Sequence, residues 1–299
     1  MKLLFSPPYL EDGLRRAVLG GGWADLEVVS SLEGCAPGDY ARVALVAGSP
    51  ASAWTWAHSQ GLTEKGAALQ VASRLLANAA NVDGLLGALR VEEAELRVNP
   101  VSTLSQIVAF LCEDQALSWQ PPDDIGDSFS SASGETPDAA ELGALEFYGR
   151  LPLAPGIAAW WPPDIFHFAE PSPAGAIDIC GPARNLMFGP YVCLSPGLWQ
   201  AELRFEVCED AARYDYIVDF NLPGNATECV VRPIGPGRQV ATLRHRVSAT
   251  APAEIRLWLG RAAFHGHLRV VGAKLTLLER SVPMTFGPMA DLSEQESSR

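Results

Sequence analysis

Apolar and polar residues alternate along several short segments in the second half of the chain. The alternating segments are residues 199–207, 214–220, 255–259, 267–271 and 274–278. A period of two predicts strands that bury one face and expose the other. Turn sequences such as Ser195-Pro196-Gly197 and Pro223-Gly224 separate these segments, as they do in antiparallel all-β domains. We therefore expect residues 151–285 to fold as a β-sandwich or jelly roll.

Residues 1–118 have a different pattern, in which short apolar runs alternate with longer segments of helical period. Strands are expected at residues 2–6, 26–29 and 43–47, and helices at residues 14–19, 63–82 and 101–112. The two longer helices carry apolar residues at three- and four-residue spacing, and Thr63 and Pro100 are residue types that begin helices. Strands interleaved with helices predict an α/β domain built on a parallel sheet.

Residues 119–150 connect the two patterns. Residues 120–137 combine Pro, Gly, Ser and acidic residues with few apolar ones, a composition typical of a linker. A short helix is expected after Pro137, with Leu142 and Leu145 on its apolar side. Residues 286–299 are rich in Ser and Glu and are expected to form a mobile tail. The sequence thus predicts two domains joined by an acidic tether.

The acidic balance of the chain excludes some classes of partner. The 299 residues hold 22 Lys and Arg against 35 Asp and Glu, a formal charge of -13. Binding to nucleic acid needs clustered basic residues, so no nucleic-acid partner is expected. Lys occurs only at Lys2, Lys65 and Lys274, so the chain has no polybasic patch for a membrane surface. No apolar run reaches the roughly 20 residues of a membrane span. We expect a cytoplasmic protein without a membrane span.

The charge is unevenly distributed along the chain. Residues 151–299 hold 13 basic and 15 acidic residues, and 12 of the 13 basic ones are Arg. Arginine suits paired hydrogen bonds to carboxylates and other planar anions. The sandwich is therefore nearly neutral, and an arginine-lined site for an acidic glycan is compatible with its composition.

The cysteines and histidines do not form a recognisable metal site. Six cysteines are scattered without a Cys-x-x-Cys pair, so buried free thiols are expected. His265 and His267 stand two residues apart and could offer two ligands from one strand face. No third histidine is near them in the sequence. We therefore expect no metal and no cofactor.

Three fragments of the first domain, in order, resemble bacterial sulfotransferases built on the P-loop α/β fold. The fragments are residues 3–21 (LLFSPPYLEDGLRRAVLGG), 44–61 (ALVAGSPASAWTWAHSQG) and 89–111 (LRVEEAELRVNPVSTLSQIVAFL). In that family the first fragment carries the phosphosulfate loop, and the second holds the 3′-phosphate of the donor nucleotide. The resemblance implies a P-loop-like turn after the first strand of residues 1–118.

The residues that would hold the donor depart from the family's pattern. The first loop reads Pro7-Pro8-Tyr9-Leu10-Glu11-Asp12-Gly13. Its two prolines remove N–H donors, and its two carboxylates repel a phosphosulfate. Gly48 and Trp56 stand where the family has an Arg and a Ser that bind the 3′-phosphate. We therefore expect a degenerate relative without catalytic residues.

A second resemblance covers about residues 175–280. Residues 188–205 (FGPYVCLSPGLWQAELRF), 253–258 (AEIRLW) and 268–277 (LRVVGAKLTL) are similar to β-sandwich modules appended to bacterial glycosyltransferases and other surface-polysaccharide proteins. The resemblance implies that the partner is a glycan or a protein of polysaccharide assembly.

A sandwich that binds sugar needs aromatic rings for the C–H face of a pyranose and planar polar side chains for its hydroxyls. The candidate ligand-binding residues are Tyr214, Asp215, Tyr216, Arg238, Trp258, His265 and His267. Tyr214 and Tyr216 share one strand face, where they either line a groove or pack in the core. Trp199 and Trp258 alternate with polar neighbours, a pattern more typical of core residues.

Trp160-Trp161-Pro162-Pro163 is a further aromatic cluster. It either staples the linker helix to the sandwich, which we favour, or presents an exposed anchor to a partner.

The chain lacks the common catalytic motifs: it has no Gly-x-Ser-x-Gly, no His-Glu-x-x-His, no intact Walker loop and no dinucleotide fingerprint. The sequence favours a non-catalytic carbohydrate-binding or accessory protein in bacterial surface-polysaccharide assembly or modification. One alternative is a sulfotransferase-like transferase with an altered donor site. Another is a protein–protein adaptor that uses Trp160 and Trp161.

Overall fold

The computed structural model describes residues 2–19, 26–30, 40–62, 64, 66–84, 88–112, 129, 138–170 and 176–281. These residues divide into two compact units. The first unit forms within Met1–Gly48 and Asn81–Ser131, and the second within Ser49–Ala80 and Ala132–Ser281. Residues 119–128 and 130–137 of the expected linker, and the expected tail, lie outside the described residues. The domain limits expected from the sequence stay a prediction.

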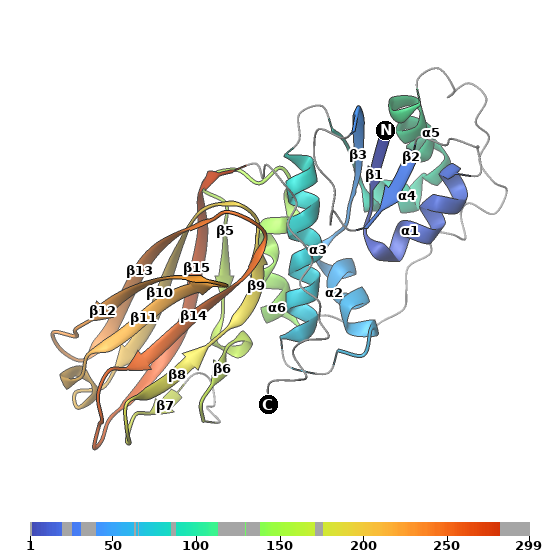
Figure 1. Ribbon diagram of the computed structural model, residues 1–299. Coiled ribbons are helices and arrows are strands. Elements are labelled where there is room, and N and C mark those ends of the chain that lie inside the picture. The colour runs from blue at the N-terminus through green and yellow to red at the C-terminus, as the bar shows by residue number, and fades with distance from the viewer. Residues whose placement is uncertain are drawn as a thin grey trace. The chain divides into compact units, whose positions relative to one another are not determined.

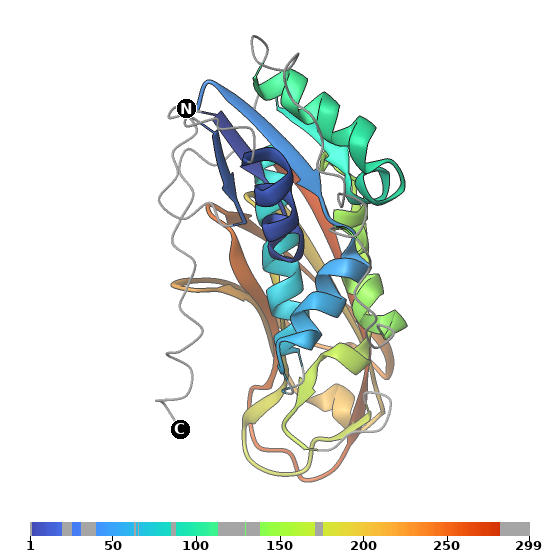
Figure 2. The same ribbon diagram turned by 90° about the vertical axis from the view of Figure 1, so that its right-hand side faces the viewer.

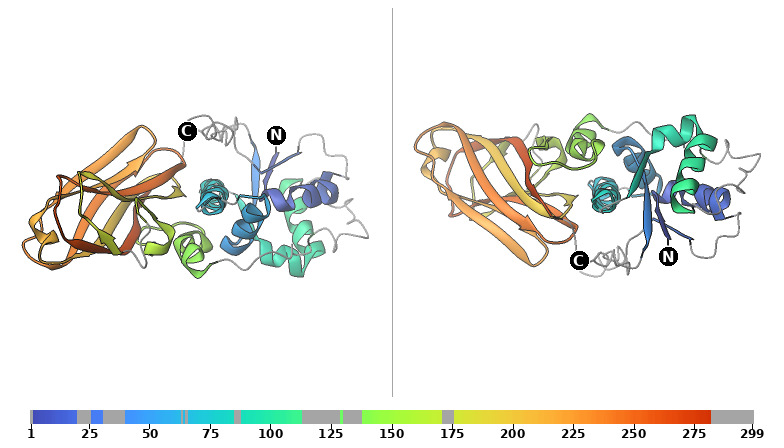
Figure 3. Two further views of the ribbon diagram at one scale, coloured as in Figure 1. Left: turned by 90° about the horizontal axis from the view of Figure 1, so that it is seen from below. Right: turned by 90° about the horizontal axis from the view of Figure 1, so that it is seen from above.

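The first unit is a parallel sheet of four strands with helices on one face. In sheet order its strands are β2 (Leu26–Val29), β1 (Lys2–Phe5), β3 (Arg42–Ala47) and β4 (Leu89–Glu92). The helices on that face are α1 (Pro8–Leu14), α4 (Glu93–Val98) and α5 (Pro100–Leu111) (Figure 3). A π-helical turn at Arg15–Leu19 follows α1. Leu4 and Val46 of the sheet pack with Leu10 and Ile107 of these helices. The parallel α/β arrangement expected from the sequence is confirmed.

Three helices accompany the strands of the second unit. They are α2 (Pro50–Ser59), α3 (Ala67–Asp83), which belongs to this unit up to Ala80, and α6 (Ala139–Ala144). Ser49 caps α2 by accepting a hydrogen bond from Ser52 N at 3.1 Å, as serine commonly does before a helix. Helices α2 and α6 are in contact, as Figure 2 shows, and Trp54 Nε1 donates to the Glu141 carboxylate between them.

The rest of the second unit consists of two antiparallel sheets (Figure 1). The β10 sheet has the order β13-β10-β15-β5, with β7 also paired to β15. Its strands are β5 (Ala158–Trp161), β7 (Ala176–Asp178), β10 (Gly197–Val207), β13 (Gly237–Val247) and β15 (His267–Arg280). The β14 sheet has the order β12-β11-β14-β8-β6, with β9 also paired to β14. Its strands are β6 (His167–Phe168), β8 (Arg184–Phe188), β9 (Pro190–Leu194), β11 (Tyr216–Leu222), β12 (Asn225–Val231) and β14 (Ala251–Leu259).

The two sheets share one hydrophobic core, as the two-residue period predicts. Every second residue of β10 is buried along its whole length. Trp199 and Phe205 of β10 and Tyr216 and Phe220 of β11 are completely buried. Phe205 and Tyr216 meet edge to face, with ring centroids 5.5 Å apart, an arrangement that aromatic pairs favour. The β-rich second part of the chain is thus confirmed, and Trp199 is a core residue.

The two neighbouring tryptophans of β5 face opposite sides of the strand. Trp161 is completely buried, and its Nε1 donates to the carbonyl oxygen of Ala144 at 3.3 Å. It therefore fastens α6 to the sandwich, as the staple interpretation requires. Trp160 lies on the outer face of the β10 sheet with 36% of its surface exposed.

None of the described cysteines forms a disulfide bond. Cys112 and Cys193 are buried, Cys208 and Cys229 are half-buried, and Cys180 is exposed. The expectation that the cysteines are buried is therefore wrong for Cys180. Cys35 lies outside the described residues.

A buried serine on α3 holds that helix against β9. Ser73 is completely buried, and its Oγ accepts a hydrogen bond from Cys193 N at 2.8 Å. The same Oγ donates to Gln70 O at 2.8 Å. Beside it, Tyr148 Oη donates to Cys193 O at 2.7 Å and accepts from Ser195 N at 3.1 Å. The backbone groups at this end of β9 are thus satisfied by side chains from outside the sheets.

We predict that Ser73→Ala lowers the free energy of unfolding by about 1–3 kcal/mol, because it leaves the buried N–H of Cys193 without an acceptor. Chemical denaturation measures the change. Ser105→Ala is the matched control, since Ser105 only donates to Val101 O on an exposed helix face, and its effect should stay within about 0.5 kcal/mol. Equal effects of the two substitutions would contradict a docking role for Ser73.

Candidate functional site

The outer face of the β14 sheet gathers polar and aromatic side chains from neighbouring strands. The pairing register places Trp258 opposite Ile217 and Asn185, Arg256 opposite Asp219, and Glu254 opposite Asn221. Residues directly opposite each other project to the same side of a sheet. These side chains, with Tyr191 of β9, are called the β14 face below.

Glu254 is the centre of the hydrogen bonding on the β14 face. It is 5% exposed, and its carboxylate accepts from Tyr191 Oη at 2.9 Å, Asn221 Nδ2 at 3.1 Å and Arg256 Nε at 2.7 Å. A carboxylate at this depth is tolerated because a cation and further donors surround it. Glu254 therefore fixes the orientation of three neighbouring side chains.

Tyr191 has an unusual backbone conformation. Among the described residues it is the only non-glycine residue with a positive φ, 67°. A side chain in the left-handed region costs on the order of 1–3 kcal/mol and persists where surrounding contacts enforce it. Here the contacting group is Glu254. Burial, followed by the hydrogen bond to Glu254, raises the pKa of the Tyr191 phenol, so the ring stays a neutral donor.

Trp258 is half-buried and is held in place by Asp219. Its Nε1 donates to Asp219 Oδ2 at 3.0 Å. The second carboxylate oxygen, Asp219 Oδ1, is buried without a hydrogen-bond partner, and so is Asn185 Oδ1 on the other side of Trp258. Buried polar atoms without partners are uncommon in proteins. Two unused acceptors therefore flank one positioned indole.

Further aromatic rings border the β14 face along β6, β8 and β9. His167 and Phe188 stack with ring centroids 5.2 Å apart, and His167 and Tyr191 lie 6.0 Å apart. Gly189 leaves room for this contact, since a Cβ there would lie 3.0 Å from His167 Cδ2. The face thus has an aromatic border beside a polar centre.

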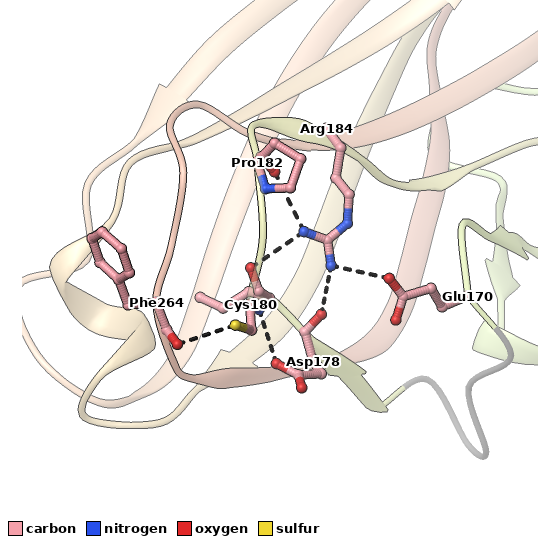
Figure 4. A network of polar contacts seen from close by, with 7 residues as sticks. Glu170, Asp178, Cys180, Pro182, Arg184 and Phe264 are labelled. Carbon is pink, nitrogen blue, oxygen red and sulfur yellow. Dashed lines mark hydrogen bonds and ion pairs between the residues drawn. The ribbon is translucent and has the colours of Figure 1, made fainter.

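Arg184 anchors the strand that carries Asn185. Figure 4 shows its guanidinium between the Glu170 carboxylate and the backbone oxygens of the preceding loop. Nη2 donates to Asp178 O at 2.9 Å and to Glu170 Oε1 at 3.3 Å, and Nη1 donates to Pro182 O at 3.4 Å. These bonds fix the start of β8, where Asn185 lies beside Trp258.

The structure does not gather the residues expected from the sequence into one site. Tyr216 is completely buried, and its hydroxyl donates to Ala211 O at 2.9 Å, so it packs in the core instead of lining a groove. Tyr214 lies before β11, with the Arg261 guanidinium 5.3 Å from its ring centroid. Asp215 pairs with Arg232 at 3.4 Å. Tyr214, Asp215 and Tyr216 thus lie just before or at the start of β11.

The remaining expected residues are also dispersed. Arg238 is on the β10 sheet, where it pairs with Glu206 at 3.5 Å. His265 and His267 are exposed at the start of β15, and His267 lies opposite Asp178 of β7. In the described part of the chain, no group of three or more His, Cys, Asp or Glu side chains is placed to hold a metal ion. Of the expected residues, only Trp258 belongs to the β14 face.

The members of the β14 face that the sequence analysis missed are Asn185, Tyr191, Asp219, Asn221, Glu254 and Arg256. A period-two pattern places Asp219, Asn221, Glu254 and Arg256 on outward positions of their strands. The pattern does not say which strands are neighbours, so it could not bring these positions together. Nothing in the sequence signals the positive φ of Tyr191.

Residues 8–13 of the segment that resembles a phosphosulfate loop belong to helix α1, and only Ser6 and Pro7 connect this helix to β1. Tyr9 Oη donates to Glu93 Oε2 at 2.9 Å, and Glu93 is 4% exposed. A Cβ on Gly48 would lie 2.5 Å from Tyr9 Oη. A tyrosine and a carboxylate thus meet at the carboxyl ends of β1, β3 and β4, the edge at which ligands bind in open parallel sheets.

No family model and no curated protein matches the chain. Among solved structures, the chain is similar to the carbohydrate-binding module TmCBM61 in complex with beta-1,4-galactotriose (12% identity, 42% of this chain, 89% of that chain, TM-score 0.28). It is also similar to a family 16 carbohydrate-binding module (14% identity, 40% of this chain, 86% of that chain, TM-score 0.26). A third similar structure is the glycosylation-associated Gap123 complex from Streptococcus agalactiae (9% identity, 64% of this chain, 46% of that chain, TM-score 0.31). Identity and TM-score are low in each case, and the contacts of the β14 face carry the functional argument. None of the described helices is long and apolar enough to cross a membrane.

We predict that Asp219→Asn raises the free energy of unfolding at pH 7. Burial is the main cause that raises the pKa of the Asp219 carboxyl, so its charged form is disfavoured in the folded state. The asparagine removes the charge and keeps an acceptor for Trp258 Nε1. The gain should shrink as pH falls through the raised pKa, because the native carboxyl then becomes neutral itself.

Chemical denaturation at several pH values measures the difference between the two proteins. Asp164→Asn, at an exposed position, is the control and should give no such pH-dependent difference. A gain that persists unchanged at acidic pH would contradict the assignment.

Proposed function

We propose that the second unit binds carbohydrate on the β14 face and that Trp258 is its central contact. The observation that carries the proposal is the fixed indole between two buried, unpartnered acceptors, Asp219 Oδ1 and Asn185 Oδ1. An indole offers an apolar face to the C–H groups of a sugar ring. The two acceptors have almost no exposed surface, so they bond hydroxyl groups at the edge of the same ring only after neighbouring side chains move aside on binding.

The layout of the face suits an oligosaccharide. From Trp258 to Glu254 the strand advances four residues, about 13 Å by the rise of a β-strand. Trp258 stands at one end of this row, and Tyr191 with its bond to Glu254 stands at the other. Arg256 and Asp219, which lie opposite each other, are between them. A ligand longer than one monosaccharide would contact both ends.

The charges of the face favour a neutral sugar. Arg256 already binds Glu254 at 2.7 Å, and the oxygens that remain unbonded are acceptors. A sugar carboxylate or sulfate would meet Asp219 and Glu254 without a free cation to pair with.

We include the cellular setting in the proposal: a non-catalytic accessory protein of bacterial surface-polysaccharide assembly or modification, with a glycan or an assembly protein as partner. The resemblance of residues 188–205, 253–258 and 268–277 to modules of surface-polysaccharide proteins supports it. The contact between Tyr9 and Glu93 at the edge of the first unit's sheet speaks against the alternative of a transferase, because a carboxylate there repels an anionic donor.

We predict that the full chain binds neutral oligosaccharides on a glycan array and that Trp258→Ala weakens the binding by roughly tenfold, the equivalent of about 1.4 kcal/mol. Isothermal titration calorimetry with the best array ligand measures the loss. Phe264→Ala removes another aromatic ring, 80% exposed and outside the β14 face, and should leave the affinity unchanged. Absence of any array signal, or equal losses in the two variants, would refute the proposal.

A further inference from the structure

The outer face of the β10 sheet has the opposite charge from the chain as a whole. Its outward positions on β10, β13 and β15 carry six basic side chains, Arg204, Arg238, Arg244, Arg246, Arg269 and Lys274, and three acidic ones, Glu202, Glu206 and Glu279. The difference is +3, on a chain whose formal charge is -13. These side chains, with Trp160, are called the β10 face below.

Most of the arginines of the β10 face are already paired. Glu206 takes both Arg269 at 2.7 Å and Arg238 at 3.5 Å. The other two pairs are Arg246 with Glu279 at 2.7 Å and Arg204 with Glu202 at 3.3 Å. On the short edge strand β7, the Asp178 carboxylate accepts from Cys180 N. The acidic groups of this sheet are thus used locally.

Two cations of the β10 face have no acidic partner among the described residues. Arg244 Nε donates to the neutral amide oxygen of Gln200 at 2.9 Å. Lys274 lies between Glu202 and Trp160 in the register, and no ion pair is formed by its ammonium group within the described part of the chain. Both side chains are exposed. They are available to an anion from outside.

Trp160 provides an aromatic surface beside these cations. Its indole extends across β15, where a Cβ on Gly272 would lie 2.5 Å from Trp160 Cζ2. Gly272 has a φ of 133°, so the glycine is required by both conformation and space. On the far side of β15, the Arg204 guanidinium lies 5.6 Å from the ring centroid of Trp160.

The spacing of these groups fits an extended chain with separated charges. Arg244 and Lys274 are two strands apart, roughly 10 Å across the sheet, and Trp160 is one strand further. Three of the nine charged side chains of the β10 face are glutamates, and one of them, Glu202, lies opposite Lys274. Duplex DNA, with one phosphate per about 1.7 Å of its axis, would meet these glutamates. A polysaccharide with one acidic group on each sugar or disaccharide has more widely spaced charges, so its acidic groups would not meet these glutamates.

We propose that the β10 face is a second binding surface, which takes an anionic polysaccharide through Arg244, Lys274 and Trp160. Carboxylate or sulfate groups of the polymer pair with the two cations, and a sugar ring packs on the exposed part of the indole. This site is independent of the β14 face, which lies on the other sheet and lacks a free cation.

Binding of the full chain to three soluble polymers tests the proposal: polygalacturonate as the carboxylate probe, dextran sulfate as the sulfate probe and dextran as the neutral one. We expect one or both acidic polymers to bind at low salt and dextran not to bind. Changing Arg244→Glu and Lys274→Glu together should weaken this binding about tenfold or more. Trp160→Ala should weaken it roughly threefold to tenfold.

The control reverses two exposed arginines away from the β10 face, Arg213→Glu and Arg232→Glu, with the same change in net charge. This variant should keep its affinity, and Trp258→Ala should keep it as well. Thermal melting of every variant checks that the fold is retained. Three results would overturn the proposal: neither acidic polymer binds better than dextran, the control loses as much affinity as the β10-face variant, or a single-stranded oligo-dT binds more tightly than both polymers.

Discussion

The second unit is organised by a single constraint, the two-residue period of long strands that share one core. Once Trp199, Phe205, Tyr216 and Phe220 occupy that core, each intervening residue has to project from one of two outer faces. The outer faces are therefore determined by the residues that the core does not use. In this chain the two faces differ in chemistry: one has a buried carboxylate, Glu254, and unpartnered acceptors, and the other has an excess of arginine.

The secondary structure follows closely from local patterns, and the assembly of the site does not. The alternation of β10 is readable because eleven residues keep one period, and the Ser-Pro start of α2 supplies its own cap. Trp258 shows the limit of such patterns. It is large and apolar like Trp199, which is in the core, yet it lies on the same side of its strand as Glu254 and Arg256. The core side of β14 is filled by Ile255, Leu257 and Leu259 instead.

The expected ligand residues are dispersed in the structure for a related reason. They were chosen by residue type within single segments, whereas the β14 face is assembled from β8, β9, β11 and β14, whose order in the sheet differs from their order in the sequence. Tyr216 is the clearest example, because its hydroxyl finds a backbone acceptor five residues earlier and so permits complete burial. A polar tip alone does not place a tyrosine at the surface.

The adjacent tryptophans of β5 also limit how this chain can change over evolutionary time. Trp161 is bound to α6 and Trp160 is seated over Gly272, on opposite sides of one short strand. An insertion or deletion of one residue near this pair would exchange their sides, losing the helix attachment and the surface ring in the same event. The length of β5 is consequently more constrained than its sequence, so homologues should differ by substitutions around the pair and not by gaps within it.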